Sequence, residues 1–345
     1  MKQLVSRRRV MIGTMSAAAG LSLMSSLPRL GAAQEASPAA SPAAAGTAFP
    51  VTIAHAYGET TLETAPLRVV SVGWSSYDSL ISLGTIPVAQ QRFDWGGDAD
   101  GFLPWTREAI GDAELPLVYD ATEIPFEIIA GANPDLILGV YSGITDTEYE
   151  TLSGIAPTIA YPEVSWGTSW QDVHTVTGQA LGKPDEAAAK IAEIEALIAS
   201  QVEQYPQLAG KTFAYGTVGA SEFGVYTVSD ARSRFLSAIG LEPSDFVKNL
   251  DSNEWTVQVS FELAGTIESD IFISWFSTQE EVDAALALPT FQSIPAVANG
   301  AFAPIIGQDV VMASSAFSVL SIPYMLEAFI PTLAAAADAA DAAAG

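Results

Sequence analysis

The stretch FEIIAGANPDLIL at residues 126–138 is echoed by FELAGTIESDIFI at residues 261–273. In each copy a Phe-Glu pair opens a short helical segment, and an Asp precedes an apolar run typical of a buried strand. The Phe, the Glu and the Asp are all displaced by 135 positions, from 126 to 261, from 127 to 262 and from 135 to 270. The repeat predicts a chain built from two structurally similar halves.

Short apolar runs alternate with helical patterns in both halves. Strands are predicted at LRVVSVGW (67–74), TIPVAQ (85–90), LPLVYD (115–120), DLILGVY (135–141), TIAY (158–161), KTFAYGTV (211–218), SDIFISWF (269–276) and FAPI (302–305). This alternation predicts an α/β fold in which helices cover mainly parallel sheets.

One segment, KPDEAAAKIAEIEALIASQVEQYP at residues 183–206, differs from everything around it. Its apolar residues recur at helical spacing, acidic residues occupy the first turn, and Pro206 follows the pattern. We expect a long helix over residues 184–206 that bridges an N-terminal lobe (49–183) and a C-terminal lobe (207–333).

The first 33 residues have the order of an export signal. A basic cluster at residues 7–9 precedes a moderately apolar run, and small residues at Gly31 and Ala33 suit a cleavage site after Ala33. The Ser-Arg-Arg start of the cluster favours a twin-arginine signal. A membrane anchor that is retained is the alternative, because the apolar run is about 18 residues long.

Two segments of low complexity flank the predicted folded part. Residues 34–48 are rich in Ala, Pro and Ser and are expected to form a linker, whereas residues 334–345 are mostly Ala and are expected to form a tail.

Charge and cysteine content exclude several classes of function. The chain has 40 acidic and 14 basic residues, of which five basic ones lie in the signal, so the exported part carries 9 − 40 = −31. That charge argues against nucleic acid and anionic membranes as partners. The chain contains no cysteine, which excludes disulfides, thiol catalysis, cysteine-bound metal and a lipid-modified cysteine anchor.

No motif indicates catalysis or a resident metal. The sequence has no G-x-S-x-G, no phosphate-binding G-x-x-x-x-G-K-[ST] and no G-x-G-x-x-G. Its two histidines, His55 and His174, lie far apart in the chain, so no metal-ligand cluster is visible. We therefore expect a protein that is not an enzyme and has no catalytic residues, no metal site and no cofactor.

Several segments together resemble the substrate-binding proteins of iron-siderophore and vitamin B12 ABC importers. They are FPVTIAHAYGETTLETAPLRVVSVGW (49–74), IPFEIIAGANPDLILG (124–139), VSFELAGTIESDIFISW (259–275) and the long helix, while RFDWGGDADGFLPW (92–105) is similar to the iron-siderophore branch. The resemblance implies a class III solute-binding protein: two Rossmann-like α/β lobes bridged by a single long helix, with the ligand in the cleft between them.

The resemblance also implies roles for particular residues. Glu127 and Glu262 match the glutamates with which that family docks onto arginines of its membrane permease. A simpler reading is that each glutamate complements the dipole of its own helix.

The segments after the strands are expected to form the cleft, because ligands of open α/β sheets bind beyond the carboxyl ends of the strands. Aromatic residues there suit a bulky, partly apolar ligand, and scarce arginines suit anionic groups on it, although core packing and ion pairs are alternatives. Met312 is expected to fill the core, or else to face the cleft. The candidate ligand-binding residues are Trp74, Arg92, Trp95, Tyr141, Trp166, Arg232, Trp255 and Trp275.

The resemblance therefore predicts capture of a ferric siderophore and its delivery to an ABC permease with its ATPase, with haem or a cobalamin as the alternative ligand. The expected location is the periplasm or the outer face of the cytoplasmic membrane, and the expected state is a monomer.

Overall fold

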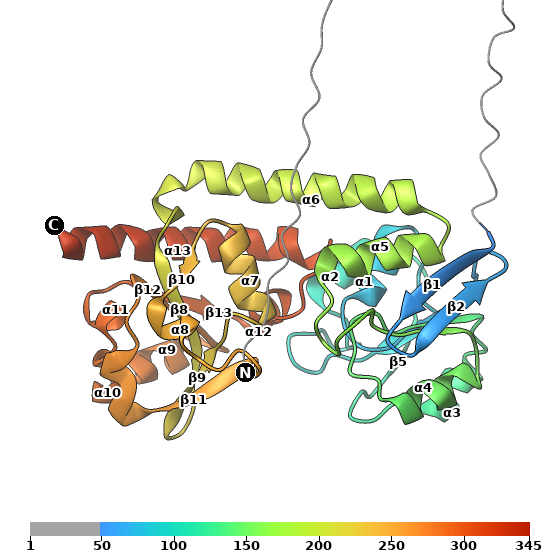
Figure 1. Cartoon of the computed structure of the whole chain (residues 1–345), viewed down its shortest axis with the longest axis horizontal. Helices are drawn as coiled ribbons and strands as arrows, with labels where there is room; N and C mark the ends of the chain where they lie inside the picture. The colour runs from blue at the N-terminus through green and yellow to red at the C-terminus, as the bar shows by residue number, and fades with distance from the viewer. Residues whose placement is uncertain (1–48) are drawn as a thin grey trace, which may run out of the picture. The chain divides into compact units, whose positions relative to one another are not determined.

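The computed structural model describes residues 49–345, so the predicted export signal (1–33) and linker (34–48) lie outside the described residues. The described part begins with an antiparallel hairpin, β1 (Val51–His55) and β2 (Gly58–Leu62). Two α/β lobes follow, and one long helix lies across both of them (Figure 1).

The N-terminal lobe is built on a five-stranded sheet that is parallel throughout, in the order β5-β4-β3-β6-β7. Its strands are β3 (Val69–Ser71), β4 (Ala89–Gln91), β5 (Leu117–Tyr119), β6 (Leu136–Leu138) and β7 (Thr158–Ile159). Its helices are α1 (Ser76–Ser82), α2 (Pro104–Ile110), α3 (Phe126–Gly131), α4 (Asp146–Ser153) and α5 (Trp170–Ala180).

Strand alternation divides the core of this lobe into two layers. Val69 packs with Leu80 of α1 and Val173 of α5 on one face of the sheet, whereas Val70 packs with Ile129 of α3 and Leu152 of α4 on the other. Because both faces are covered by helices, the strands read as continuous apolar runs rather than as alternating ones.

The bridging helix is α6 (Pro184–Gln204), two residues shorter than the predicted 184–206. It starts with a proline at the first position and with Asp185 and Glu186 in its first turn, as helix starts favour. Pro206 does not extend it but opens a 3-10 turn, η1 (Pro206–Leu208). The helix contacts α5 of the first lobe and the last helix of the second.

The C-terminal lobe has a six-stranded mixed sheet in the order β11-β9-β8-β12-β13, with β10 also paired to β8. Its strands are β8 (Thr212–Val218), β9 (Glu222–Tyr226), β10 (Glu242–Pro243), β11 (Thr256–Ser260), β12 (Ile271–Phe276) and β13 (Phe302–Ile306). Its helices are α7 (Ala231–Ala238), α8 (Asp245–Lys248), η2 (Phe261–Thr266), α9 (Gln279–Leu286), α10 (Pro289–Gln292), α11 (Pro295–Ala298), α12 (Gln308–Ala313) and α13 (Ser321–Ala344).

Strands β9 and β11 run antiparallel to their neighbours and were not among the predicted strands. The connection between β8 and β9 is only three residues long, residues 219–221, and so short a turn can join antiparallel strands but not parallel ones. The lobe is therefore only partly the parallel sheet that the sequence predicts.

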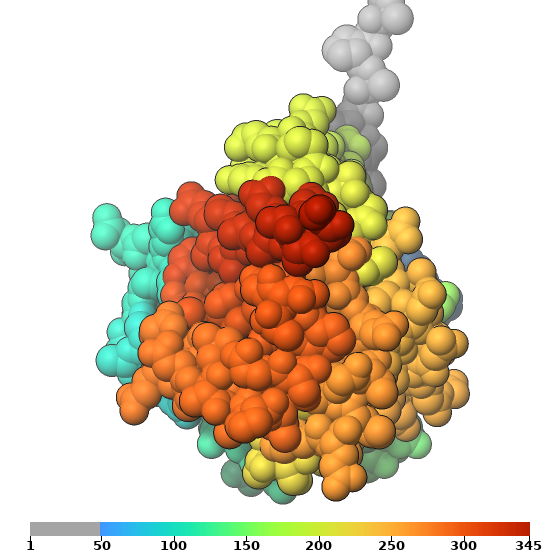
Figure 2. All heavy atoms as spheres, turned by 90° about the vertical axis from the view of Figure 1, so that its left-hand side faces the viewer, coloured from blue at the N-terminus to red at the C-terminus, as the bar shows by residue number. Residues whose placement is uncertain are grey.

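The last helix corrects the expected boundary at residue 333. α13 continues through the Ala-rich residues 334–345 to Ala344, and Ala336 and Ala337 are buried. Alanine favours helix, and its small side chain allows close packing against neighbouring elements. Figure 2 shows this helix in red beneath α6, over the end of the C-terminal lobe. The segment is part of the fold and not a tail.

The repeated phrase has the same structural role in both lobes. Asp135, just before β6, accepts hydrogen bonds from the backbone N–H groups of Leu67 and Arg68 at 2.8 Å, ahead of β3. Asp270, just before β12, accepts from the N–H of Thr212 at 2.7 Å, where β8 begins. In each lobe the Asp satisfies backbone donors at the start of the neighbouring strand.

The two lobes share one apolar core, and the buried carboxylate of Asp78 lies beside it. Asp78 of α1 accepts hydrogen bonds from Trp105 Nε1 (2.8 Å) and Thr106 Oγ1 (2.7 Å) in the first lobe, and from Ser318 Oγ (2.6 Å) just before α13. Around it, the ring of Trp105 lies 5.3 Å from that of Tyr324, centroid to centroid. Burial raises the pKa of Asp78 to about 6, although its three hydrogen-bond donors oppose the rise.

We predict that Asp78 makes the protein less stable as the pH rises from about 4 through about 6. The folded state holds the carboxyl proton more tightly than the unfolded state does, so the free energy of unfolding falls over that range and levels above it. In Asp78→Asn this contribution is absent. The free energy of unfolding of Asp78→Asn relative to the wild type should therefore rise between pH 4 and pH 7.

Urea unfolding at several pH values measures this difference, and Asp112→Asn, at an exposed position just after α2, is a matched control. A difference between Asp78→Asn and the wild type that stayed constant across the range would contradict the prediction.

Candidate ligand-binding cleft

A cavity of about 1080 Å³ lies between the two lobes. It is formed where the strands of both sheets end, beyond β3 and β6 on one side and beyond β9 and β12 on the other. Such a position is the expected place for a ligand in open α/β sheets. Its lining residues include Trp74, Trp95, Tyr141, Trp166, Tyr226, Asp230, Arg232, Arg234, Glu254, Trp255, Trp275, Met312 and Ser315.

Seven of the eight residues predicted to bind ligand line this one cavity, and Arg92 does not. Arg92 instead donates from Nε to Asp94 Oδ1 at 2.5 Å and from Nη2 to the carbonyl of Ala99 at 3.0 Å. The expectation that Arg92 faces the cleft is thus not met, because a local carboxylate and a loop carbonyl hold its guanidinium.

The aromatic residues of the cavity meet in pairs. Trp95 of the first lobe and Trp275 of the second are T-shaped at 5.8 Å between ring centroids. Trp166 is T-shaped to Tyr141 at 5.5 Å. The outer rings remain accessible, since Trp166 is 45% and Trp255 59% exposed. Together these rings offer large flat surfaces to a bulky ligand.

A glycine allows the lobes to approach each other beside the cavity. Gly96 has a φ of +80°, and a Cβ there would lie 2.9 Å from the carbonyl oxygen of Gln308 and 3.0 Å from Cγ of Met312. Only glycine fits this conformation and this contact without displacement. Met312 itself is largely buried and also lines the cavity, so both of its expected roles hold.

Arg232 is the best-anchored charge in the cavity. Its Nε and Nη2 donate to the two oxygens of Asp230, each at 2.9 Å, and its Nη1 donates to Ser315 Oγ at 3.1 Å. The guanidinium carbon lies 3.9 Å from the ring centre of Tyr226. Burial alone would lower the pKa of Arg232, but Asp230 and Tyr226 outweigh burial and raise that pKa, so the guanidinium stays charged.

Tyr226 and Tyr141 present protonated phenols. Burial raises the pKa of both hydroxyls, although the nearby positive charge of Arg232 opposes the rise. The hydroxyl of Tyr226 accepts from Trp275 Nε1 at 3.1 Å, so its own proton is available to donate. Sequence reasoning missed Tyr226 because it lies in the antiparallel strand that was not predicted.

The two glutamates of the repeated phrase lie on the surface. Glu127 is in the first turn of α3 and Glu262 in the first turn of η2, and both are exposed. Neither side chain forms a hydrogen bond or an ion pair with another residue in the range 49–345. Each is followed by an exposed aliphatic residue, Ile128 (43%) and Leu263 (52%). The two lobes thus present matching acidic and apolar pairs.

Neither histidine lies in the cavity. His174 is buried on α5, and burial, with the charge of Lys190, lowers its pKa to about 4. His55 contacts Thr60 within the first hairpin at 3.0 Å. No group of three or more metal-ligating side chains occurs within residues 49–345. In the same range, no helix is both long enough and apolar enough to span a bilayer.

Comparison with known proteins identifies this architecture. The model of the family described as "Periplasmic binding protein" matches residues 69–305. This chain belongs to that family. Among curated members, the Fe(3+)-citrate-binding protein YfmC of Bacillus subtilis is 28% identical over 252 residues, which cover 70% of this chain and 74% of YfmC. The ferric enterobactin-binding periplasmic protein FepB of Escherichia coli is 27% identical over 267 residues, or 73% and 82% of the two chains.

Solved structures of the family agree with the two-lobed fold. PiaA of Streptococcus pneumoniae TIGR4 in complex with ferrichrome is similar with a TM-score of 0.76 and 33% identity, over 84% of this periplasmic binding protein and 99% of PiaA. A solute-binding protein of Mycobacterium smegmatis is similar with a TM-score of 0.72 and 27% identity, over 82% and 97% of the two chains. YfmC, FepB and the Mycobacterium smegmatis protein are each named as binding proteins.

Proposed function

We propose that this chain is the extracytoplasmic binding protein of an ABC importer and that it captures a ferric siderophore of the hydroxamate class in the interlobe cleft. The observation that carries the proposal is an aromatic cavity whose formal charges cancel. Its lining holds two arginines, Arg232 and Arg234, and two carboxylates, Asp230 and Glu254.

The charge balance selects among ferric complexes. Three singly charged hydroxamates neutralise one ferric ion, whereas three catecholates leave the complex strongly negative. A neutral complex loses little hydration on entering an aromatic cavity, whereas an anionic one would also meet the field of a strongly acidic protein. The similarity to PiaA in complex with ferrichrome, a trihydroxamate chelate, supports the same class.

Capture needs only stacking and a few donors. Indole rings cover the apolar surface of the chelate, while the free N–H groups of Arg232 and the hydroxyl of Tyr226 donate to its carbonyl oxygens. Because Arg232 is already fixed by Asp230 and Ser315, it loses little conformational entropy when ligand binds.

Haem or a cobalamin is the second candidate ligand. Haem binding would use an axial Tyr, His or Met, and the cavity contains Tyr141, Tyr226 and Met312. Burial keeps both phenols protonated, and Tyr226 is held by Trp275, which favours a hydrogen-bonding role over ligation.

We predict that tryptophan fluorescence will be quenched saturably by a neutral ferric trihydroxamate, and at least about tenfold more weakly by a ferric triscatecholate of similar size. Arg232→Gln should weaken binding of the trihydroxamate about tenfold or more, because it removes charged donors from a buried site. Arg92→Gln is the matched control, since Arg92 lies outside the cavity, and it should bind like the wild type. Saturation by haem or a cobalamin alone would overturn the ligand class.

We also propose that Glu127 and Glu262 dock this protein onto a membrane permease that works with an ATPase. Their support is the matched exposure of the two glutamates and of Ile128 and Leu263 beside them. Stabilisation of its own helix dipole by each glutamate is compatible with docking. That role alone, however, would require neither two matched sites nor exposed aliphatic neighbours.

The double variant Glu127→Arg with Glu262→Arg is expected to abolish uptake of the ferric chelate while leaving its affinity for the purified protein nearly unchanged. Glu280→Arg is a matched control, since Glu280 is an exposed first-turn glutamate of α9 and tests the helix dipole alone. Uptake by cells and fluorescence titration provide the two measurements. Loss of chelate binding in the double variant would instead assign these glutamates to the fold or the cleft.

Ligand binding is expected to close the cleft only slightly. The lobes share a core and the Asp78 hydrogen bonds, so a large rotation would break buried polar contacts. The radius of gyration from small-angle scattering should therefore stay nearly unchanged when the protein is saturated with ligand. A large decrease in the radius of gyration would contradict the expectation that the shared core holds the lobes in place.

The proposed setting follows from this role. The protein acts outside the cytoplasmic membrane, in the periplasm or at the outer face of that membrane, and works as a monomer that carries no cofactor.

A further inference from the structure

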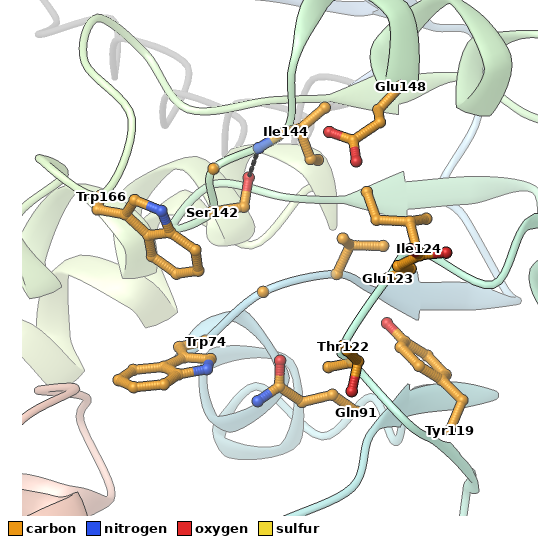
Figure 3. Close-up of a pocket in the computed structure, with 14 residues that line it drawn as sticks. Trp74, Gln91, Tyr119, Thr122, Glu123, Ile124, Ser142, Ile144, Glu148 and Trp166 are labelled. Carbon is orange, nitrogen blue, oxygen red and sulfur yellow. Dashed lines mark hydrogen bonds between the residues drawn. The ribbon is translucent and has the colours of Figure 1, made fainter.

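A second cavity of about 400 Å³ lies within the N-terminal lobe, beside the cleft. Figure 3 shows it between the two indoles of Trp74 and Trp166 on one side and Tyr119, Glu123 and Glu148 on the other. It is formed beyond the carboxyl ends of β3, β4, β5 and β6. We refer to it as the side chamber, and its volume is at the lower end of the range for small-molecule sites.

The side chamber and the cleft share a wall. Trp74 and Trp166 line both cavities, and their rings are T-shaped at 5.9 Å between centroids. A ligand that stacks on these rings in the cleft therefore lies at the edge of the side chamber.

Both indoles of the shared wall are held in place. With the Gln91 amide oriented to suit its neighbours, its oxygen accepts from Trp74 Nε1 at 2.8 Å. Trp166 has a φ of +58°, which is unfavourable for a tryptophan, and its backbone N–H donates to the carbonyl of Ser142 at 3.0 Å. Its ring lies so close to Gly143 that a Cβ there would approach Trp166 Nε1 to 2.4 Å. Backbone strain of this kind is retained where the surrounding contacts hold a residue in place, and it occurs most often at ligand-binding and active sites.

The charges of the side chamber differ from those of the cleft. Its lining contains two carboxylates, Glu123 and Glu148, and no basic residue. Glu148 accepts from the N–H and the hydroxyl of Thr145 through Oε2, both at 2.8 Å, which leaves Oε1 free. Within residues 49–345, the Glu123 carboxylate forms no ion pair. The chamber is thus electronegative, whereas the formal charges of the cleft cancel.

Carboxylates opposite aromatic rings suit an organic cation. An alkylammonium gains charge attraction from the carboxylates and cation–π attraction from the indoles. A bare metal ion does not fit, because two carboxylates from separate segments of the chain are too few ligands and the described residues hold no larger group.

We propose that the side chamber binds a protonated amine arm of the chelate that occupies the cleft, with Glu123 and Glu148 as its counter-charges. The inference rests on the proposed function and makes it more specific: the preferred ligand is a ferric hydroxamate with a free amine. Such an amine has a pKa of about 10 and is charged at neutral pH.

The test compares two chelates that differ only in that charge. A linear ferric trihydroxamate with a free terminal amine and its N-acetylated form are titrated separately into the protein, and tryptophan fluorescence gives both dissociation constants. We expect the free-amine compound to bind about tenfold more tightly. The preference should shrink at high ionic strength, because the chamber is open to solvent.

The double variant Glu123→Gln with Glu148→Gln should bind both compounds with equal affinity. The amide that Glu148→Gln introduces can still complete the hydrogen bonds with Thr145 at the start of α4, so the helix is preserved. Glu150→Gln is the matched control, since Glu150 is an exposed residue of the same helix that does not line the chamber, and it should retain the preference.

Equal affinity of the wild-type protein for the two compounds would overturn the inference and leave the proposed function standing. A preference for the free amine that survives the double variant would also overturn it, because the amine would then bind elsewhere. Failure of these and all other ferric hydroxamates to bind would overturn the proposed function and the inference together.

Discussion

The buried carboxylate of Asp78 is the contact on which the arrangement of the two lobes depends. It accepts hydrogen bonds from both lobes inside one continuous core, so the lobes cannot separate without leaving a charge or several donors without partners. The bridging helix α6 alone could not fix this geometry, since only Ala187 and Ile194 of its residues are fully buried. Two contacts beside the cleft require this fixed placement of the lobes. They are the contact of Trp95 with Trp275 and the close approach of Gly96 to α12.

The repeated phrase meets the same structural need twice. In each lobe, an Asp that precedes one strand accepts hydrogen bonds from backbone N–H groups at or just before the start of the neighbouring strand. Glu127 and Glu262, by contrast, form no side-chain hydrogen bond within residues 49–345. The aspartates of the repeated phrase thus have a structural role, whereas its glutamates remain available to a partner protein. A membrane permease with two related halves would meet two related surfaces.

The cleft is nearly neutral although the protein is strongly acidic. Asp230 and Arg232 neutralise each other at its wall, Arg234 and Glu254 carry opposite formal charges, and five tryptophans and two tyrosines supply its aromatic surface. Under the proposed function, stacking and a few fixed donors would dominate there, whereas the carboxylates without a basic counterpart, Glu123 and Glu148, line the side chamber next to it. The two tryptophans of the shared wall place these two environments in contact, which would allow one ligand to be recognised by its shape and by a single charged arm.

The sequence by itself determined the α/β pattern, the bridging helix and the aromatic residues at strand ends, because each depends on the spacing of residues close together in the chain. It also revealed the duplication, because two segments 135 positions apart share the same residues at matching places. Only the tertiary structure decided which of two arginines faces the cleft, since Arg92 and Arg232 both lie near a loop aspartate. It also decided that β9 and β11 pair antiparallel, that α13 continues through the Ala-rich end, and that Ser318 meets Asp78 across 240 positions. The pairing of β9 with β11, the packing of α13 and the hydrogen bond between Ser318 and Asp78 depend on contacts between residues distant in the chain, which no local pattern encodes.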